Sequence, residues 1–282
     1  ANISGHNNTA LGFEALQAST ASNNTALGYQ AGLVIGTGFA NTIIGTVAGD
    51  ALTTGSVNTA VGYSALGAEQ TGTGNVAIGE DAQGLSNGGV NNTCVGTTAG
   101  YQISTGDNNL VLGHDASRSG SPGGALTTGS NQICLADENI THAYVQVDWS
   151  IASDQRDKTD FTALDLGLDF VKALAPVTYK WDKRSKYGDK KSEGYDLNAQ
   201  SPDGTHKEDW LDVGFKAQEV EALEIAAGYN KSSKTNLISS HTKDGKQMGL
   251  QYSKFVPILV KAIQEQNALI EALTARIETL EG

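Results

Sequence analysis

The sequence predicts a mainly β shaft, built as a solenoid, followed by an α+β domain that ends in a coiled-coil helix. Three observations support this fold class. A short repeat fills the first half of the 282 residues, the composition changes near residue 150, and apolar heptads close the chain. The expected domains are a glycine-rich shaft over 1–140, a linker over 141–152 and a second domain over 153–282, and about two domains are usual for this length.

The first half repeats a block of Asn, two or three small or β-branched residues, Gly, two variable residues and Ala. The Gly lies at positions 12, 28, 45, 62, 79, 96 and 113, so the period is 17 after a first step of 16. A decayed copy follows a longer insert at 131–135. Such a period is typical of a solenoid, because one short strand cannot bury its apolar face until neighbouring units stack on it.

Stacking predicts columns of equivalent residues. One apolar column is expected to line the interior: Leu11, Leu27, Ile44, Val61, Ile78, Val95 and Leu112. The recurring Ala suits a tighter corner, the recurring Gly a turn with positive φ, and the recurring Asn a turn or a side-chain ladder. A core this thin is marginal in one chain. Three copies around an axis would bury the remaining apolar face, so we expect a homotrimer.

The composition shifts at the predicted boundary. Residues 1–152 hold one basic residue, Arg118, and 25 of the 34 Gly, whereas residues 153–282 hold the other 18 basic residues. A shift this sharp marks a domain boundary near 150. Because the chain opens inside a repeat and without Met, we expect it to be part of a longer protein.

Charge and residue types argue against several functions. The formal net charge of −12 disfavours nucleic acid and anionic membranes as partners. The sequence has no run of about 18 apolar residues, so no membrane span is predicted. The acidic residues of the first half, Glu69 and Glu80 among them, share no register for glycoside cleavage and are expected on a solvated surface. Cys94 and Cys134 fall on interior registers and are expected as buried free thiols, with a disulfide as the alternative. The five His are scattered, so we expect no metal and no cofactor.

The repeat resembles known fibrous heads and shafts. The blocks NNTALGYQAG, VNTAVGYSALG and GNVAIGEDAQG are similar to the left-handed β-roll of trimeric autotransporter adhesin heads. They also resemble the shaft repeats upstream of phage fibre chaperones. The resemblance covers about residues 1–136 and implies a left-handed parallel β-roll that holds a trimer out from a surface.

The second half opens with Ser153-Asp154-Gln155-Arg156-Asp157-Lys158, which resembles the opening of the intramolecular chaperones classed as peptidase family S74. Segments 171–181, 213–220 and 252–265 resemble further parts of that family, in the same order. The resemblance implies a phage tail fibre or tailspike in the virion, assembled in the host cytoplasm. Its partners would be two further copies, a host cell-surface receptor and other fibre or baseplate proteins.

The same resemblance implies a single-turnover serine endopeptidase with Ser153 as nucleophile and Lys158 as general base. Five residues on a strand or helix do not bring two side chains together, so this pair needs a turn between them or a second chain. Attack on the Ala152 carbonyl would give an N-to-O acyl shift, although the bond from Ser153 to Asp154 stays open as the site. In the structural alternative, Ser153 and Asp154 only cap a helix and Lys158 lies in solvent.

Heptads over 252–281 predict a coiled coil. Its two seams are Val256, Ile263, Ile270 and Ile277, and Leu259, Gln266, Leu273 and Leu280. Ile on one seam and Leu on the other more often favour a dimer, whereas the resemblance implies a trimer. An amphipathic helix packed on its own domain is the alternative. The polar stretch 183–209 is expected to form loops that wrap neighbouring subunits.

Two functions follow. In the first, a trimeric fibre segment carries a chaperone that drives assembly and then cuts itself away next to Ser153. In the second, a structural adhesin or fibre tip does not cleave, keeps its C-terminal domain as a permanent trimer clamp and binds a host receptor. A membrane-released transcription factor of the myelin regulatory type is disfavoured, because only Arg118 is basic upstream of 153.

Overall fold

The computed structural model describes residues 4–190, 192, 194–232 and 234–282. The chain divides into two compact units. The first comprises the chain up to Thr141 together with Asp182–His206 and Thr242–Gln247, and the second comprises His142–Trp181, Lys207–His241 and Met248–Gly282. No helix among the described residues is long and apolar enough to cross a membrane.

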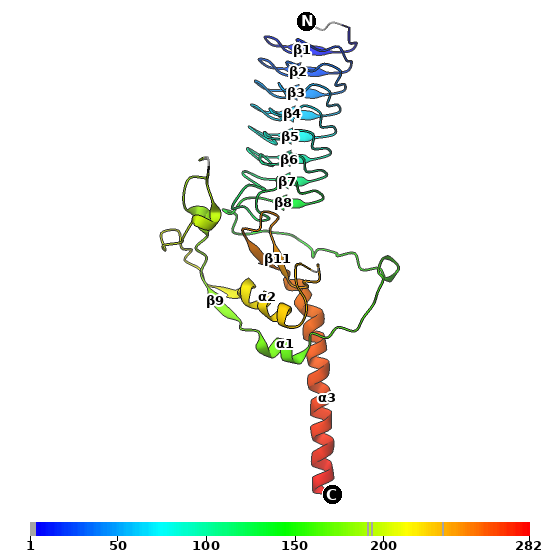
Figure 1. Cartoon of the computed structure of the whole chain (residues 1–282), viewed down its shortest axis with the longest axis vertical. Helices are drawn as coiled ribbons and strands as arrows, with labels where there is room; N and C mark the ends of the chain where they lie inside the picture. Colours follow the sequence, from blue (N-terminus) through cyan, green and yellow to red (C-terminus); the bar gives the residue numbers. More distant parts are fainter. Residues whose placement is uncertain (1–3, 191, 193, 233) are drawn as a thin grey trace. The chain divides into compact units, whose positions relative to one another are not determined.

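The first unit contains a parallel β-solenoid (Figure 1). Eight three-residue strands form one sheet in chain order, each paired with the equivalent residues of the next repeat. They are β1 (Thr9–Leu11), β2 (Thr25–Leu27), β3 (Thr42–Ile44), β4 (Thr59–Val61), β5 (Val76–Ile78), β6 (Thr93–Val95), β7 (Leu110–Leu112) and β8 (Ile133–Leu135). The solenoid predicted from the repeat is confirmed.

The interior of the solenoid is lined by the central residue of each strand. From β2 onward that residue is buried: Ala26, Ile43, Ala60, Ala77, Cys94, Val111 and Cys134. The predicted interior column is wrong, because its members face outward, with Leu11 68% and Leu112 37% exposed. Successive strand side chains point to opposite faces, so an offset of one residue exchanges inside for outside.

The alanine and glycine columns behave as predicted. Ala31 and its equivalents up to Ala116 are fully buried. The recurring Gly has positive φ, 136° at Gly45 and 138° at Gly62. A Cβ on Gly45 would lie 2.2 Å from the carbonyl oxygen of Gly62, so both the turn and the close approach of neighbouring repeats require Gly.

The recurring Asn forms the predicted ladder. The backbone N–H of Asn58 donates to the Oδ1 of Asn41 at 2.9 Å, and the N–H of Asn75 donates to the Oδ1 of Asn58 at the same distance. The Nδ2 of Asn58 donates to the carbonyl of Gly72 at 2.8 Å. Each buried Asn therefore holds its own repeat to the repeats on either side.

A carboxyl group lies in the buried column that contains Leu52, Ser86 and Ile103. Glu69 is fully buried there, so its expected place on a solvated surface is wrong. Its Oε1 accepts from the N–H groups of Gly72 at 2.6 Å and Gly88 at 2.7 Å, and its Oε2 from the Ser86 hydroxyl at 2.6 Å. Buried carboxylates persist when such donors replace water.

The first unit also includes segments from beyond residue 153. Residues 182–206, with the 3₁₀ turns η2 (Arg184–Lys186) and η3 (Leu197–Ala199), lie against the last solenoid turn, as does 242–247. Lys183 Nζ donates to the Glu138 carbonyl at 3.0 Å, Lys190 forms an ion pair with Glu138, and the Ala125 N–H donates to Asp244 at 3.1 Å. The polar stretch thus contacts its own shaft, and wrapping of neighbouring subunits stays a prediction.

The second unit is a mixed α/β region. Strands β9 (Val177–Tyr179) and β10 (Asp212–Gly214) pair antiparallel, as do β11 (Ser239–His241) and β12 (Met248–Leu250). Helices α1 (Leu168–Ala173), α2 (Ala217–Ala226) and α3 (Phe255–Glu281) surround a core. The buried core residues are Leu166, Phe170, Val220, Ile238, Phe255 and Ile258.

Helix α3 begins in this core and then leaves it. Phe255, Ile258 and Ala262 are buried, whereas every residue from Gln266 to Gly282 is exposed. The predicted long terminal helix is confirmed, with 27 residues. Packing on its own domain, the alternative, holds only for the first turns of the helix, and the coiled coil stays a prediction.

Glu224 anchors the β11 segment to α2. Its Oε1 accepts from the N–H groups of Leu237 and Ile238 at 2.7 and 2.6 Å, and its Oε2 accepts from the N–H of Ser239 at 3.0 Å. Burial alone would raise the pKa of Glu224, but these hydrogen bonds lower it below its ordinary value. A carboxylate held in this way stabilises the fold only while it is ionised.

We expect Glu69→Gln to destabilise the shaft by about 1–3 kcal/mol, because the amide cannot accept all the hydrogen bonds that the carboxylate accepts. Chemical denaturation followed by circular dichroism measures the change. Glu80→Gln, at an exposed position of the same shaft, is the matched control and should leave the midpoint unchanged. Equal midpoints for Glu69→Gln and Glu80→Gln would contradict the role given to Glu69.

We expect Glu224→Gln to weaken the second unit at neutral pH and to make its stability less dependent on pH in acid. Because the folded pKa is depressed, the Glu224 contribution is present above the unfolded pKa of about 4.3 and is lost as pH falls through the folded pKa. Denaturation midpoints between pH 7 and pH 3 measure this. Exposed Glu271→Gln is the control, and a pH profile unchanged by Glu224→Gln would refute the anchor.

Candidate active site

A tight turn separates the two residues predicted to carry the cleavage chemistry. The 3₁₀ turn η1 (Gln155–Asp157) begins after Asp154, whose Oδ1 accepts from the N–H of Arg156 at 2.9 Å. The chain returns to an extended backbone at Lys158. Of the two possibilities that the five-residue spacing left open, a turn and a second chain, the single chain has the turn.

The turn brings the predicted pair together within one chain. Lys158 Nζ donates to the Ser153 Oγ at 2.5 Å. A base within hydrogen-bond reach of a hydroxyl is the geometry that nucleophile activation needs. The structure therefore places Ser153 and Lys158 side by side.

Asp154 and Arg156 pair with each other. Arg156 Nη2 donates to Asp154 Oδ2 at 2.6 Å, and its Nε lies 3.1 Å from Asp154 Oδ1. The hydrogen bonds from the Arg156 side chain and backbone lower the pKa of Asp154. The structural alternative predicted that Ser153 and Asp154 both act as caps. In the structure, Asp154 caps the η1 turn. The Ser153 hydroxyl is hydrogen-bonded to Lys158 instead.

The site is open to solvent in the single chain. Residues 142–163, which include Ala152, Ser153 and Lys158, are all exposed. A lysine removes a hydroxyl proton only in its neutral form, which burial favours. The described residues of one chain therefore do not exclude water from Ser153 and Lys158.

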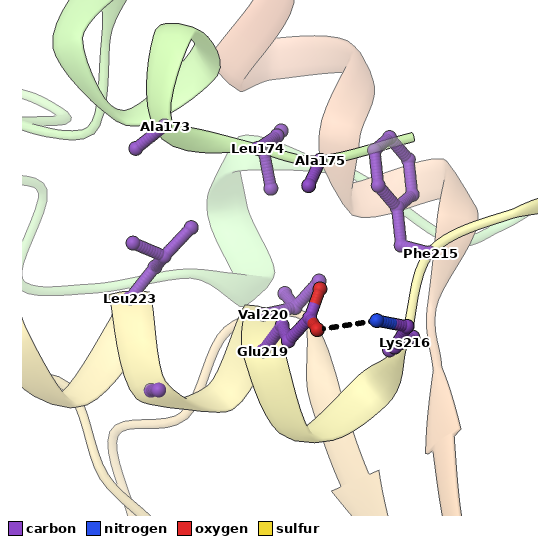
Figure 2. Close-up of a pocket in the computed structure, with 9 residues that line it drawn as sticks. Ala173, Leu174, Ala175, Phe215, Lys216, Glu219, Val220 and Leu223 are labelled. Carbon is purple, nitrogen blue, oxygen red and sulfur yellow. Dashed lines mark hydrogen bonds and ion pairs between the residues drawn. The ribbon is translucent and has the colours of Figure 1, made fainter. Parts of the chain in front are cut away.

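The second unit has an apolar pocket elsewhere (Figure 2). It has a volume of about 270 Å³ and lies between the end of α1 and the start of α2, lined by Leu174, Phe215, Val220 and Leu223 among others. Lys216 and Glu219 form an ion pair at its edge, with 2.7 Å between Nζ and Oε1. No residue of 153–158 lines this pocket, so it is separate from the predicted dyad.

The two cysteines are buried free thiols, as predicted. Burial raises the pKa of Cys94 to about 12, so Cys94 stays a thiol and packs as a small apolar residue. Among the described residues, no cluster of three or more His, Cys, Asp or Glu has the arrangement of a metal site.

The carboxylates that organise each unit were not identified from the sequence. The sequence pattern predicts a surface position for Glu69 and does not distinguish Glu224 from other acidic residues. The one available signal for Glu69 was its register, because the equivalent positions of neighbouring repeats are Leu52 and Ser86. A charged residue in a column that is otherwise apolar or small indicates a buried polar contact.

Comparison with known protein families supports the resemblance of the second half of the chain to the peptidase S74 family. Residues 153–229 match the peptidase S74 family, described as chaperone of endosialidase. The match begins at Ser153, which directly precedes Asp154, the capping residue of the η1 turn. No curated protein and no solved structure matches the chain significantly.

The match suggests a phage fibre or tailspike protein with an autocleaving chaperone. The segments that resembled this family, 153–161, 171–181 and 213–220, lie within the matched residues. The heptad helix lies beyond them. The chain therefore carries a peptidase S74 chaperone of endosialidase domain at residues 153–229, preceded by a parallel β-solenoid.

Proposed function

We propose that this chain is a segment of a trimeric phage tail fibre or tailspike whose C-terminal domain assembles the trimer and then cuts the chain beside Ser153. The observation that carries the proposal is the hydrogen bond from Lys158 to Ser153 at the first residue of the family match. The assembled fibre belongs to the virion, formed in the host cytoplasm, and meets a host receptor.

The proposed cleavage uses the groups in contact. Lys158 Nζ, in its neutral form, takes the proton of the Ser153 hydroxyl, and Oγ attacks the carbonyl carbon of Ala152. The bond from that carbon to the Ser153 nitrogen breaks, and the nitrogen receives the proton from Lys158, which leaves an ester between Ala152 and the Ser153 side chain. Water then hydrolyses the ester, giving a carboxylate at Ala152 and a free amine at Ser153.

Proximity accounts for a single slow cut by so small a site. The nucleophile and the attacked carbonyl are neighbours in the chain, and well-oriented intramolecular reactions gain about 7–11 kcal/mol over bimolecular ones. The Ala152–Ser153 bond is the one that an N-to-O shift breaks. Cleavage between Ser153 and Asp154 would need a different attacking group.

Trimer assembly would supply the burial that one chain lacks. The single chain leaves an apolar column along the outside of the solenoid and an apolar seam along α3, with Leu27, Ile270 and Leu273 among the exposed residues. Apolar seams at heptad spacing pack against copies of themselves. Three copies around one axis would cover both surfaces and exclude water near the dyad.

A non-cleaving fibre tip is the second candidate. The observation that favours it is the exposure of Ser153 and Lys158, which leaves the lysine in water. In that case the C-terminal domain stays attached as a trimer clamp, and the chain binds a host receptor through its shaft or tip.

We expect the assembled wild-type chain to split into residues 1–152 and 153–282, while Ser153→Ala and Lys158→Ala stay whole. Removal of a general base typically slows a reaction by about 10²–10⁴-fold. Denaturing gels follow the rate, and intact mass identifies the bond. Exposed Lys172→Ala is the matched control and should cleave at the wild-type rate. A wild-type chain that assembles and stays whole would instead support the non-cleaving fibre tip.

We expect Ile270→Asp to prevent trimer formation and cleavage together, because a charge in the apolar seam of α3 opposes helix association. Sedimentation velocity gives the oligomeric state, and denaturing gels give cleavage. Ala275→Asp introduces the same charge on the same helix outside both seams and should leave both unchanged. Cleavage at the wild-type rate in a monomeric Ile270→Asp chain would show that assembly is not required.

A further inference from the structure

The segment immediately before Ser153 has the side-chain pattern of a β-strand. From residue 145 to residue 151, apolar and polar side chains alternate. The apolar positions are Val145, Val147, Trp149 and Ile151, and the positions between them are Gln146, Asp148 and Ser150. This period of two puts all four apolar side chains on one face of an extended chain.

In the single chain this pattern has no partner. Residues 145–152 belong to no helix or strand. Their backbone makes no hydrogen bond within the described residues. Val147 is 76% exposed and Trp149 is 75% exposed. The backbone bends at Gln146 and Val147 in the single chain. Once extended, a segment with free backbone groups and a fully apolar face is a template for pairing with another chain.

We infer that residues 145–152 form a β-strand against the same segment of the other copies of this chain, and that this pairing seats the bond to be cut. The inference rests on the trimer of the proposed function. Val145, Val147, Trp149 and Ile151 face the shared axis, and Gln146, Asp148 and Ser150 face solvent.

The neighbours of the segment in the chain identify its partner as another copy. On its N-terminal side, β8 leaves Ile133 and Leu135 exposed at the end of the outward apolar column of the solenoid. Beyond the S74 domain, α3 presents an exposed apolar heptad seam, which is complementary to copies of itself. A segment between two surfaces that both associate around one axis lies next to its own copies.

Strand formation would order the two residues on either side of the bond to be cut. Ala152 is the last residue of the segment and Ser153 follows it directly. An Ala152 carbonyl held in an extended backbone has one orientation relative to the Ser153 Oγ, whereas a free linker samples many. Trp149 and Ile151, once buried, would also remove water from the surroundings of Lys158. The linker thus makes cleavage depend on assembly.

Face-specific cross-linking tests the inference. Val147→Cys and Gln146→Cys are each placed in the full-length Ser153→Ala chain, which keeps the linker intact, and are treated with a short bis-maleimide. We expect about tenfold more cross-linked chains for Val147→Cys, because residues 146 and 147 point to opposite faces of a strand. Cys94 and Cys134 are buried and common to both variants.

A second measurement needs no linker cysteine. Acrylamide quenching of tryptophan fluorescence is measured on the Ser153→Ala chain and on the same chain with Trp149→Phe, each shown to be a trimer by sedimentation. The difference between the two quenching curves reports the accessibility of Trp149. We expect Trp149 to be protected. A trimer with accessible Trp149, or with equal cross-linking at positions 146 and 147, overturns the inference and leaves the proposed function standing.

The remaining outcomes separate the two proposals. A monomeric Ser153→Ala chain overturns both the trimer and the linker strand. Protected Trp149 and cross-linking specific to position 147, together with a wild-type chain that never cleaves, overturn the autoproteolysis alone. Protected Trp149, cross-linking specific to position 147 and wild-type cleavage support both.

Discussion

Each turn of the solenoid depends on the next turn for its hydrogen bonds. The Asn ladder shows this most directly, because the Asn58 side chain bonds to Gly72 and Asn75 of the following turn while its backbone N–H donates to Asn41 of the preceding turn. Gly72 and Asn75 lie 14 and 17 residues after Asn58 in the chain. No turn is stable alone, so the first stacked pair carries an entropic cost that later pairs do not.

That constraint explains why the ends of the shaft need partners. The last turn is closed by residues 182–206 and 242–247, through contacts that include Lys183 to Glu138 and Ala125 to Asp244. These segments come from beyond Ser153, so the shaft and part of the second half form a single compact unit. A cut between Ala152 and Ser153 would leave this closure held by noncovalent contacts only.

The proposed site needs a contact between Ser153 and Lys158, which is local, and the exclusion of water, which would come from assembly. The η1 turn alone brings Lys158 to Ser153, so the hydrogen bond needs nothing from outside one chain. Exclusion of water is different, because residues 142–163 are exposed and a turn of three residues has no interior. A site built in this way would gain its chemistry only when copies of the chain cover it.

The sequence determined the features that depend on spacing. The period of 17 residues predicted the parallel solenoid, the recurring Gly its positive-φ turns, and the heptads the long terminal helix. The ordered segments after Ser153 predicted the family that matches 153–229. Strand and helix geometry predicted that Ser153 and Lys158 meet only through a turn between them or through a second chain.

The tertiary structure decided which of two faces is inside. Leu27 and Ala26 are neighbours on one strand, and both columns they belong to are small or apolar, so composition could not assign the interior. The closure of the shaft by residues 182–206 was also beyond the sequence, because polar contacts such as Lys183 to Glu138 have no periodic signal. Glu69 is buried because backbone N–H groups from two turns meet at its carboxylate, an arrangement that exists only after stacking.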